Sequence, residues 1–255
     1  MRIPISCALL ALALPCSAQA QLLPEQFGDS ERLYTGQRVS VFEPSVRSRA
    51  AGNQWVGPYA ALLSSDPTRP SLSLYSVDFA HYIYPASEWV VNVTGLEDGA
   101  DLSRTRLAAD PRPLGALERY RQAAYLASRL RVAPTSQWAG IHAAIWQITT
   151  PEFSTLVAQR RGDFDALTGD PGDPDGMSYW LTQAEAESSS GFSNTNLDEW
   201  RILTDTRSVG FRGGQPEVLT RVVSVPEPET WALLIPGLLI LGFFGRRRAK
   251  GSGLA

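Results

Sequence analysis

The chain has 255 residues, a net charge of −3, and only two histidines and two cysteines. The small negative charge and the lack of a basic patch argue against a nucleic-acid-binding protein. Two histidines are too few for a multi-histidine metal site, and the single lysine, Lys250, lies near the C-terminus, which excludes Schiff-base lysine chemistry in the main part of the chain.

Residues 1–20 have the pattern of a cleavable signal peptide. Met1-Arg2 is a short charged region, residues 5–14 form an apolar region, and Ala18-Gln19-Ala20 matches an Ala-x-Ala cleavage site. Cleavage after Ala20 would also remove both cysteines. We therefore expect an exported chain without disulfides, thiolate metal sites or cysteine nucleophiles.

Between this segment and residue 224, about 200 residues suit one domain with a real core. Residues 21–70 predict an N-terminal region of loops with one alternating strand, residues 38–42. In the remaining part, residues 71–224, the stretch 72–79 alternates more clearly, and residues 88–94 form a third strand candidate.

Two helices are predicted in the middle of the chain. Pro113 suits the first turn of a helix that extends to about Val132 with one apolar face. A second helix is expected from about Gln137 to Thr149, and its buried face would include Trp146.

The last third alternates between polar and strand-like stretches. Residues 163–176 are rich in Asp, Gly and Pro and predict a flexible acidic loop, whereas residues 200–203 and 218–225 predict two late strands. Strands, then two central helices, then strands favour an α+β fold with a largely antiparallel sheet or barrel.

The end of the chain, residues 225–248, combines three features in a fixed order. Val225-Pro226-Glu227-Pro228 is followed by a 14-residue apolar run, 231–244, and then by Arg246, Arg247 and Arg248. The two prolines keep the first motif extended, and the arginines would stay on the cytoplasmic side of a bilayer. As a helix the run is about 21 Å long, which is short for a hydrocarbon core of about 30 Å.

This layout resembles the PEP-CTERM sorting signal of exported proteins in Gram-negative bacteria. The resemblance implies that an exosortase-type sorting enzyme recognises the motif while the C-terminal helix anchors the protein in the inner membrane. It further implies delivery to the cell surface or the extracellular matrix. Whether the tail is cleaved stays open.

Three stretches in the middle of the chain resemble the thioester domains of bacterial surface proteins: residues 74–78 (Leu-Tyr-Ser-Val-Asp), 120–126 (Tyr-Arg-Gln-Ala-Ala-Tyr-Leu) and 141–146 (Ile-His-Ala-Ala-Ile-Trp). Residues 213–219 resemble the closing strand of the same family. There, a cysteine on a strand and a glutamine on a helix form an internal thioester that captures amines. At the corresponding positions this chain has Ser76 and His142, so the resemblance implies a retained fold without a working thioester.

Ser76, His142 and Asp78 could instead form a nucleophilic site, although no elbow glycines flank Ser76. The simpler interpretation is a small polar side chain near a buried imidazole. No cofactor is implied.

Other residues leave further alternatives open. The aspartates in the segment Asp163–Asp175 could bind calcium, but the spacing does not match an EF-hand. Glu88, Glu97 and Glu118 are candidate carboxylates for glycoside hydrolysis, and Trp55, Trp89 and Trp180 could form a sugar-binding platform. The favoured hypothesis is a non-enzymatic surface or matrix protein that acts in adhesion or in exopolysaccharide and biofilm association. The alternative is a secreted polysaccharide-active hydrolase.

Overall fold

The computed structural model describes residues 33, 35–43, 46–63, 72–81, 83, 88–110, 112, 114–159, 164–167, 169–206 and 217–222. The predicted signal peptide and the predicted sorting segment 225–248 lie outside these ranges. No helix within them is long and apolar enough to cross a membrane.

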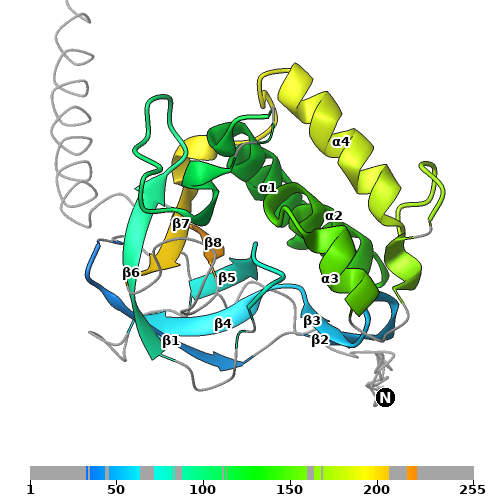
Figure 1. Ribbon diagram of the computed structural model, residues 1–255, viewed down its shortest axis with the longest axis horizontal. Helices are drawn as coiled ribbons and strands as arrows, with labels where there is room; N and C mark the ends of the chain where they lie inside the picture. The colour runs from blue at the N-terminus through cyan, green and yellow to red at the C-terminus, as the bar shows by residue number, and fades with distance from the viewer. Residues whose placement is uncertain are drawn as a thin grey trace, which may run out of the picture.

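Six strands form a closed antiparallel barrel (Figure 1). In barrel order they are β1 (Arg38–Glu43), β4 (Tyr59–Leu63), β5 (Leu72–Ser76), β8 (Val218–Arg221), β7 (Trp200–Asp205) and β6 (Glu88–Gly95). Closure pairs each strand with a neighbour on both sides, so the barrel has no free sheet edge. Two further strands, β2 (Val46–Ser48) and β3 (Gln54–Val56), form a separate hairpin-like sheet.

The helices lie together on one side of the barrel (Figure 1). They are α1 (Ala116–Leu130), α2 (Trp138–Thr149), α3 (Phe153–Gln159) and α4 (Met177–Ser189). The helices α1, α2 and α4 pack on one another. In α2 every residue except Gln147 is buried, which makes it the central helix of this layer. Short 3₁₀ turns occur at η2 (Arg49–Ala51), η3 (Arg106–Ala109), η4 (Thr135–Gln137), η5 (Asp165–Leu167) and η6 (Leu197–Glu199).

The protein has two apolar cores that share the wall of the barrel. One fills the barrel interior and includes Leu72 and Leu74 of β5. The other lies between the barrel and the helices and includes Tyr75 from the same strand. Because successive residues of a strand point to opposite faces, β5 contributes to both cores. The alternation in residues 72–79 therefore reflects two buried faces rather than one buried and one exposed.

The predicted α+β class with a largely antiparallel barrel is confirmed, and both central helices occur close to their predicted positions. Among the described strands and α-helices, five were not predicted: β2, β3, β4, α3 and α4. The acidic stretch 163–176 is described in part: Asp165–Leu167 form the 3₁₀ turn η5, the following residues form turns, and the stretch packs on α2. A Cβ at Gly140 of α2 would lie 2.5 Å from the carbonyl oxygen of Asp175, and Trp180 donates its indole N–H to Pro174 O at 2.6 Å.

Trp146 of α2 joins the helices to the chain that follows β5. Its ring is 3% exposed and lies 5.0 Å from the ring of Phe79 and 6.4 Å from that of Phe153. We predict that Trp146→Ala lowers the free energy of unfolding by about 3–5 kcal/mol, because it leaves a cavity among these rings. Urea denaturation measures the change. The exposed Val132→Ala is the control, and a midpoint for Trp146→Ala as high as that of the control would contradict the packing described.

Candidate functional site

The two positions that the sequence singles out, Ser76 and His142, lie on elements that are joined directly. Ser76 ends β5, and the chain after it is tied to the C-terminal end of α2 by two threonines. Thr149 donates its hydroxyl to Val77 O at 2.5 Å, and Thr150 Oγ1 accepts the backbone N–H of Phe79 at 3.2 Å. The strand and the helix are thus held in a fixed relation at this point.

His142 is fully buried and its imidazole is already engaged. Its Nδ1 accepts the backbone N–H of Gly57 at 2.8 Å, and its ring stacks on that of Trp146 with a centroid distance of 5.0 Å. Gly57 lies in the turn before β4 with a φ of 88°, a left-handed conformation that favours glycine. Because Nδ1 accepts, the proton of the neutral ring is on Nε2, which has no hydrogen-bond partner in the described structure. Burial lowers the pKa of His142 to about 3.

Ser76 is buried and hydrogen-bonded to its own chain. Its Oγ donates to Asp78 O at 3.3 Å. The small cavity beside it, which is also lined by Tyr59 and Trp146, has a volume of about 20 Å³. This is room for about one water molecule. The arrangement therefore offers neither a free basic nitrogen on His142 nor space for a substrate next to the Ser76 hydroxyl.

Asp78, which we considered as an orienting residue for Ser76 and His142, instead belongs to a different cluster. Its Oδ2 lies 2.8 Å from His81 Nδ1 and 3.1 Å from Arg106 Nε, while Arg106 Nη1 lies 3.0 Å from His81 Nδ1. The Asp78 and Arg106 side chains are almost fully buried, and that of His81 is 20% exposed. The Asp78 carboxylate is thus occupied by an arginine and by the histidine of its own loop.

Arg106 connects this cluster to a second buried carboxyl group, Glu217. Glu217 Oε1 accepts the backbone N–H of Arg106 at 3.1 Å and the hydroxyl of Thr204 at 2.7 Å, and Oε2 accepts the hydroxyl of Tyr120. Burial raises the pKa of Glu217 above its usual value, against the opposing effect of these hydrogen bonds and of the Arg106 charge. Burial and the neighbouring Glu217 also raise the pKa of Tyr120.

Sequence reasoning missed Arg106 and Glu217. Tyr120 and Glu217 both lie in stretches that had been singled out, but as scaffold residues only. The one sequence signal for Glu217 was its own position, an acidic residue directly before the apolar residues of β8. Nothing local distinguishes Arg106 from the other arginines, because its role depends on contacts with residues distant in sequence.

The other sequence candidates do not assemble into one site. Among the described residues, no three His, Cys, Asp or Glu side chains are grouped to hold a metal ion. Asp170 and Asp173 instead accept backbone N–H groups two residues further on, those of Gly172 and Asp175. Trp89 is buried in the barrel interior and Trp180 in the helix layer, so no common platform forms with Trp55.

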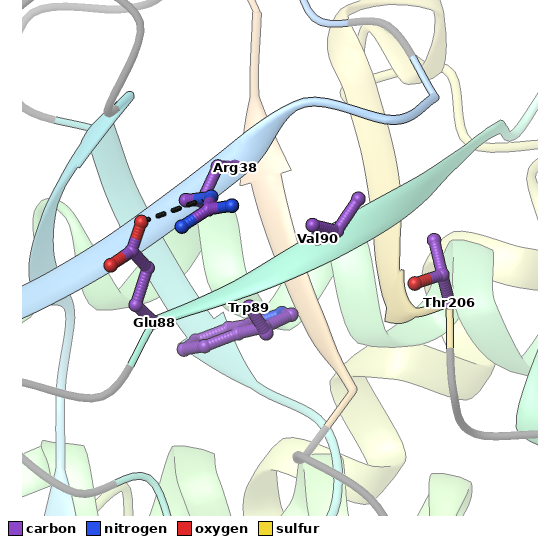
Figure 2. A pocket seen from close by; sticks show the side chains of 5 residues that line it. All are labelled: Arg38, Glu88, Trp89, Val90 and Thr206. Carbon is purple, nitrogen blue, oxygen red and sulfur yellow. Dashed lines mark ion pairs between the residues drawn. The ribbon is translucent and has the colours of Figure 1, made fainter.

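The candidate glutamates lie in two separate hollows. Glu88 lines a hollow of about 250 Å³ over β1 and β6, where Figure 2 shows it facing Arg38 of the neighbouring strand. Arg38 Nε and Glu88 Oε1 lie 3.2 Å apart. Glu97 and Glu118 line another of about 440 Å³, next to α1. There Glu97 is exposed and Glu118 accepts the hydroxyl of Ser188.

Comparison of the chain with known proteins found no matching family model, no matching curated protein and no similar solved structure. The arguments for function therefore rest on the residues themselves and on their geometry.

The buried neutral state of His142 predicts sensitivity to acid. The pKa of His142 is lowered in the folded state, so its stabilising contribution is complete above the unfolded value of about 6.5 and is lost as the pH falls towards about 3. Through this one group the free energy of unfolding changes by at most about 1.4 kcal/mol per pH unit. His142→Gln should remove this part of the acid sensitivity in urea midpoints measured from pH 7 to pH 4. His81→Gln is the matched control. If the wild type and His142→Gln showed the same pH dependence, His142 would not be buried in its neutral form.

Proposed function

We propose that the protein is an exported, transiently membrane-anchored surface or extracellular-matrix protein, which acts in adhesion or in exopolysaccharide and biofilm association without a working thioester. The observation that carries the proposal is the state of Ser76 and His142. They lie on a strand and a helix that Thr149 and Thr150 hold together, but both side chains are used in internal contacts.

The chemistry of these two side chains supports the absence of a thioester. The bond needs a thiolate as the nucleophile and a carboxamide as the acyl donor. Ser76 supplies a much weaker nucleophile, and His142 has no carbonyl group. Retention of a fold after loss of its reaction is common, because function depends on the site rather than on the scaffold.

The two ends of the sequence support export and sorting. The signal-peptide pattern of residues 1–20 and the order of motif, apolar run and arginines in residues 225–248 are features of the sequence alone. They imply an exosortase-type enzyme and the inner membrane as partners before the protein reaches the surface, and exopolysaccharide is the partner that we propose there.

The second candidate, a polysaccharide-active hydrolase, has one observation in its favour. Glu97 and Glu118 line the same open hollow, as an acid and a base of a glycosidase would. The non-enzymatic proposal is preferred because Glu118 accepts a hydrogen bond from Ser188 and the adjoining Asp98 is paired with Arg121 at 2.7 Å. These partners suit a solvated, structural role for the carboxylates.

Intact-mass measurement of the protein recovered from the cell surface tests the proposal. We expect a chain that begins at Gln21 and lacks residues 231–244, because the signal peptide and the apolar anchor are both removed on the predicted route. Treatment with a small amine should leave this mass unchanged, because there is no acyl bond to capture it. A chain with Pro226 and Pro228 both changed to Ala is the control and should keep its tail.

Two outcomes would contradict the proposal in different ways. A surface form of the wild type that retains residues 231–244 would overturn the sorting route. An amine adduct would show that a reactive acyl bond is present after all.

A further inference from the structure

A groove between α1 and α4 has a volume of about 620 Å³. We refer to it as the α1–α4 groove. It lies away from Ser76 and His142 and none of the motifs above explains it. The residues that matter for its chemistry are Arg112, Arg119, Gln122, Leu181, Glu185 and Ser188.

Arg119 in this groove is buried without enough hydrogen-bond acceptors. Its side chain is 2% exposed, and one nitrogen, Nη2, lies 3.2 Å from Asp110 Oδ2. Its Nε and Nη1 have no hydrogen-bond partner among the described residues. A buried guanidinium with unpaired N–H groups is costly, because each has given up its water without an acceptor in exchange. Arg119 thus brings unpaired N–H donors to the lining of the groove, and such donors suit an oxygen-bearing anion.

The charged side chains around Arg119 decide whether the groove favours a singly or a doubly charged anion. Arg112 is also bound to Asp110, with Nε 2.9 Å and Nη2 2.8 Å from its Oδ2, so two arginines share one carboxylate. Glu185 lies in the same groove. Together, the two arginines, Asp110 and Glu185 have no net charge. Burial, and after it the charge of Arg112, lower the pKa of Arg119, against the opposing effect of Asp110. Because Glu185 repels each negative charge of a bound group, a singly charged ligand is favoured over a doubly charged phosphate.

We propose that the α1–α4 groove binds a carboxylate group, as carried by the uronic acid units of an acidic polysaccharide. A carboxylate matches the planar, two-pronged donor pattern of a guanidinium. Arg112, whose side chain is 29% exposed, makes the first contact, and Arg119 lines the same groove. Gln122 and Ser188 offer hydrogen bonds for sugar hydroxyl groups, and Leu181 offers an apolar surface for the ring. The choice of a polysaccharide as the source rests on the proposed function, whereas the carboxylate site itself does not.

Isothermal titration calorimetry with the full-length protein in detergent tests the proposal. The probes are galacturonate and the methyl ester of galacturonic acid, which has the same ring but no charge. We expect galacturonate to bind at least tenfold more tightly than the ester. Arg112→Gln should weaken galacturonate binding by at least tenfold, and Arg119→Gln should do the same if it folds. Arg38→Gln, which removes an exposed arginine on the barrel, is the matched control and should bind like the wild type.

The outcomes separate this inference from the proposed function. Equal binding of acid and ester, no binding of either, or unchanged binding by Arg112→Gln would overturn the carboxylate site. If the acid binds as predicted but the protein does not associate with the cell's polysaccharide, the site stands and the proposed function fails. If the polysaccharide binds wild type and Arg112→Gln equally, the proposed function stands and this site is not its basis.

Discussion

The buried carboxyl group of Glu217 is the contact on which the arrangement of barrel and helices depends. It receives hydrogen bonds from the backbone of η3, from Thr204 on β7 and from Tyr120 on α1. Its own carbonyl oxygen accepts the N–H of Val77 at 3.2 Å, directly after β5. A buried carboxyl group is tolerated only when it is fully hydrogen-bonded. The donors to the carboxyl group, and with them three separate parts of the fold, must therefore remain in place together.

Arg106 extends this constraint to the end of β5. Its backbone N–H binds Glu217, and its side chain binds Asp78 and contacts His81. The chain that leaves β5 is thus held from one side by Arg106 and from the other by Thr149 of α2. This double attachment places Ser76 in a position with almost no free volume. A tightly built junction of this kind suits a structural role for the residues at the end of β5.

Much of the fold could be predicted from the sequence where one pattern dominated. The helix α1 has a clear apolar face and α2 is apolar along most of its length. In β5 the leucines alternate with other residues, and β6 is rich in β-branched residues. The strands β3 and β4 were missed because glycine and proline interrupt the region around them. The helix α4 was missed because its few buried residues, among them Trp180 and Ala184, give only a weak periodic pattern.

The candidate site was predictable only in part. Local motifs identify its residues, but their hydrogen-bond partners are distant in sequence. Short motifs identified Ser76 and His142, but not what each would touch. The partner of His142 is a backbone N–H 85 residues away in sequence, and Glu217 binds Tyr120 across 97 residues. Such contacts depend on the closed barrel, whose strand order is not contained in any local pattern. The α1–α4 groove was not predictable for the same reason.

The most direct test of this account is the pH dependence of stability with and without the Glu217 carboxyl group. Burial raises the pKa of Glu217 in the folded state, so its contribution to stability is complete below its ordinary value of about 4.5 and is lost as the pH rises through the higher folded value. Urea denaturation from pH 4 to pH 8 should show this loss in the wild type and in Asp98→Asn, whose carboxyl group is exposed. It should be absent from Glu217→Gln, which keeps the shape and one acceptor oxygen for Arg106 and Thr204 but does not titrate. The same pH dependence in all three proteins would contradict the claim that a buried carboxyl group holds the barrel and the helices together.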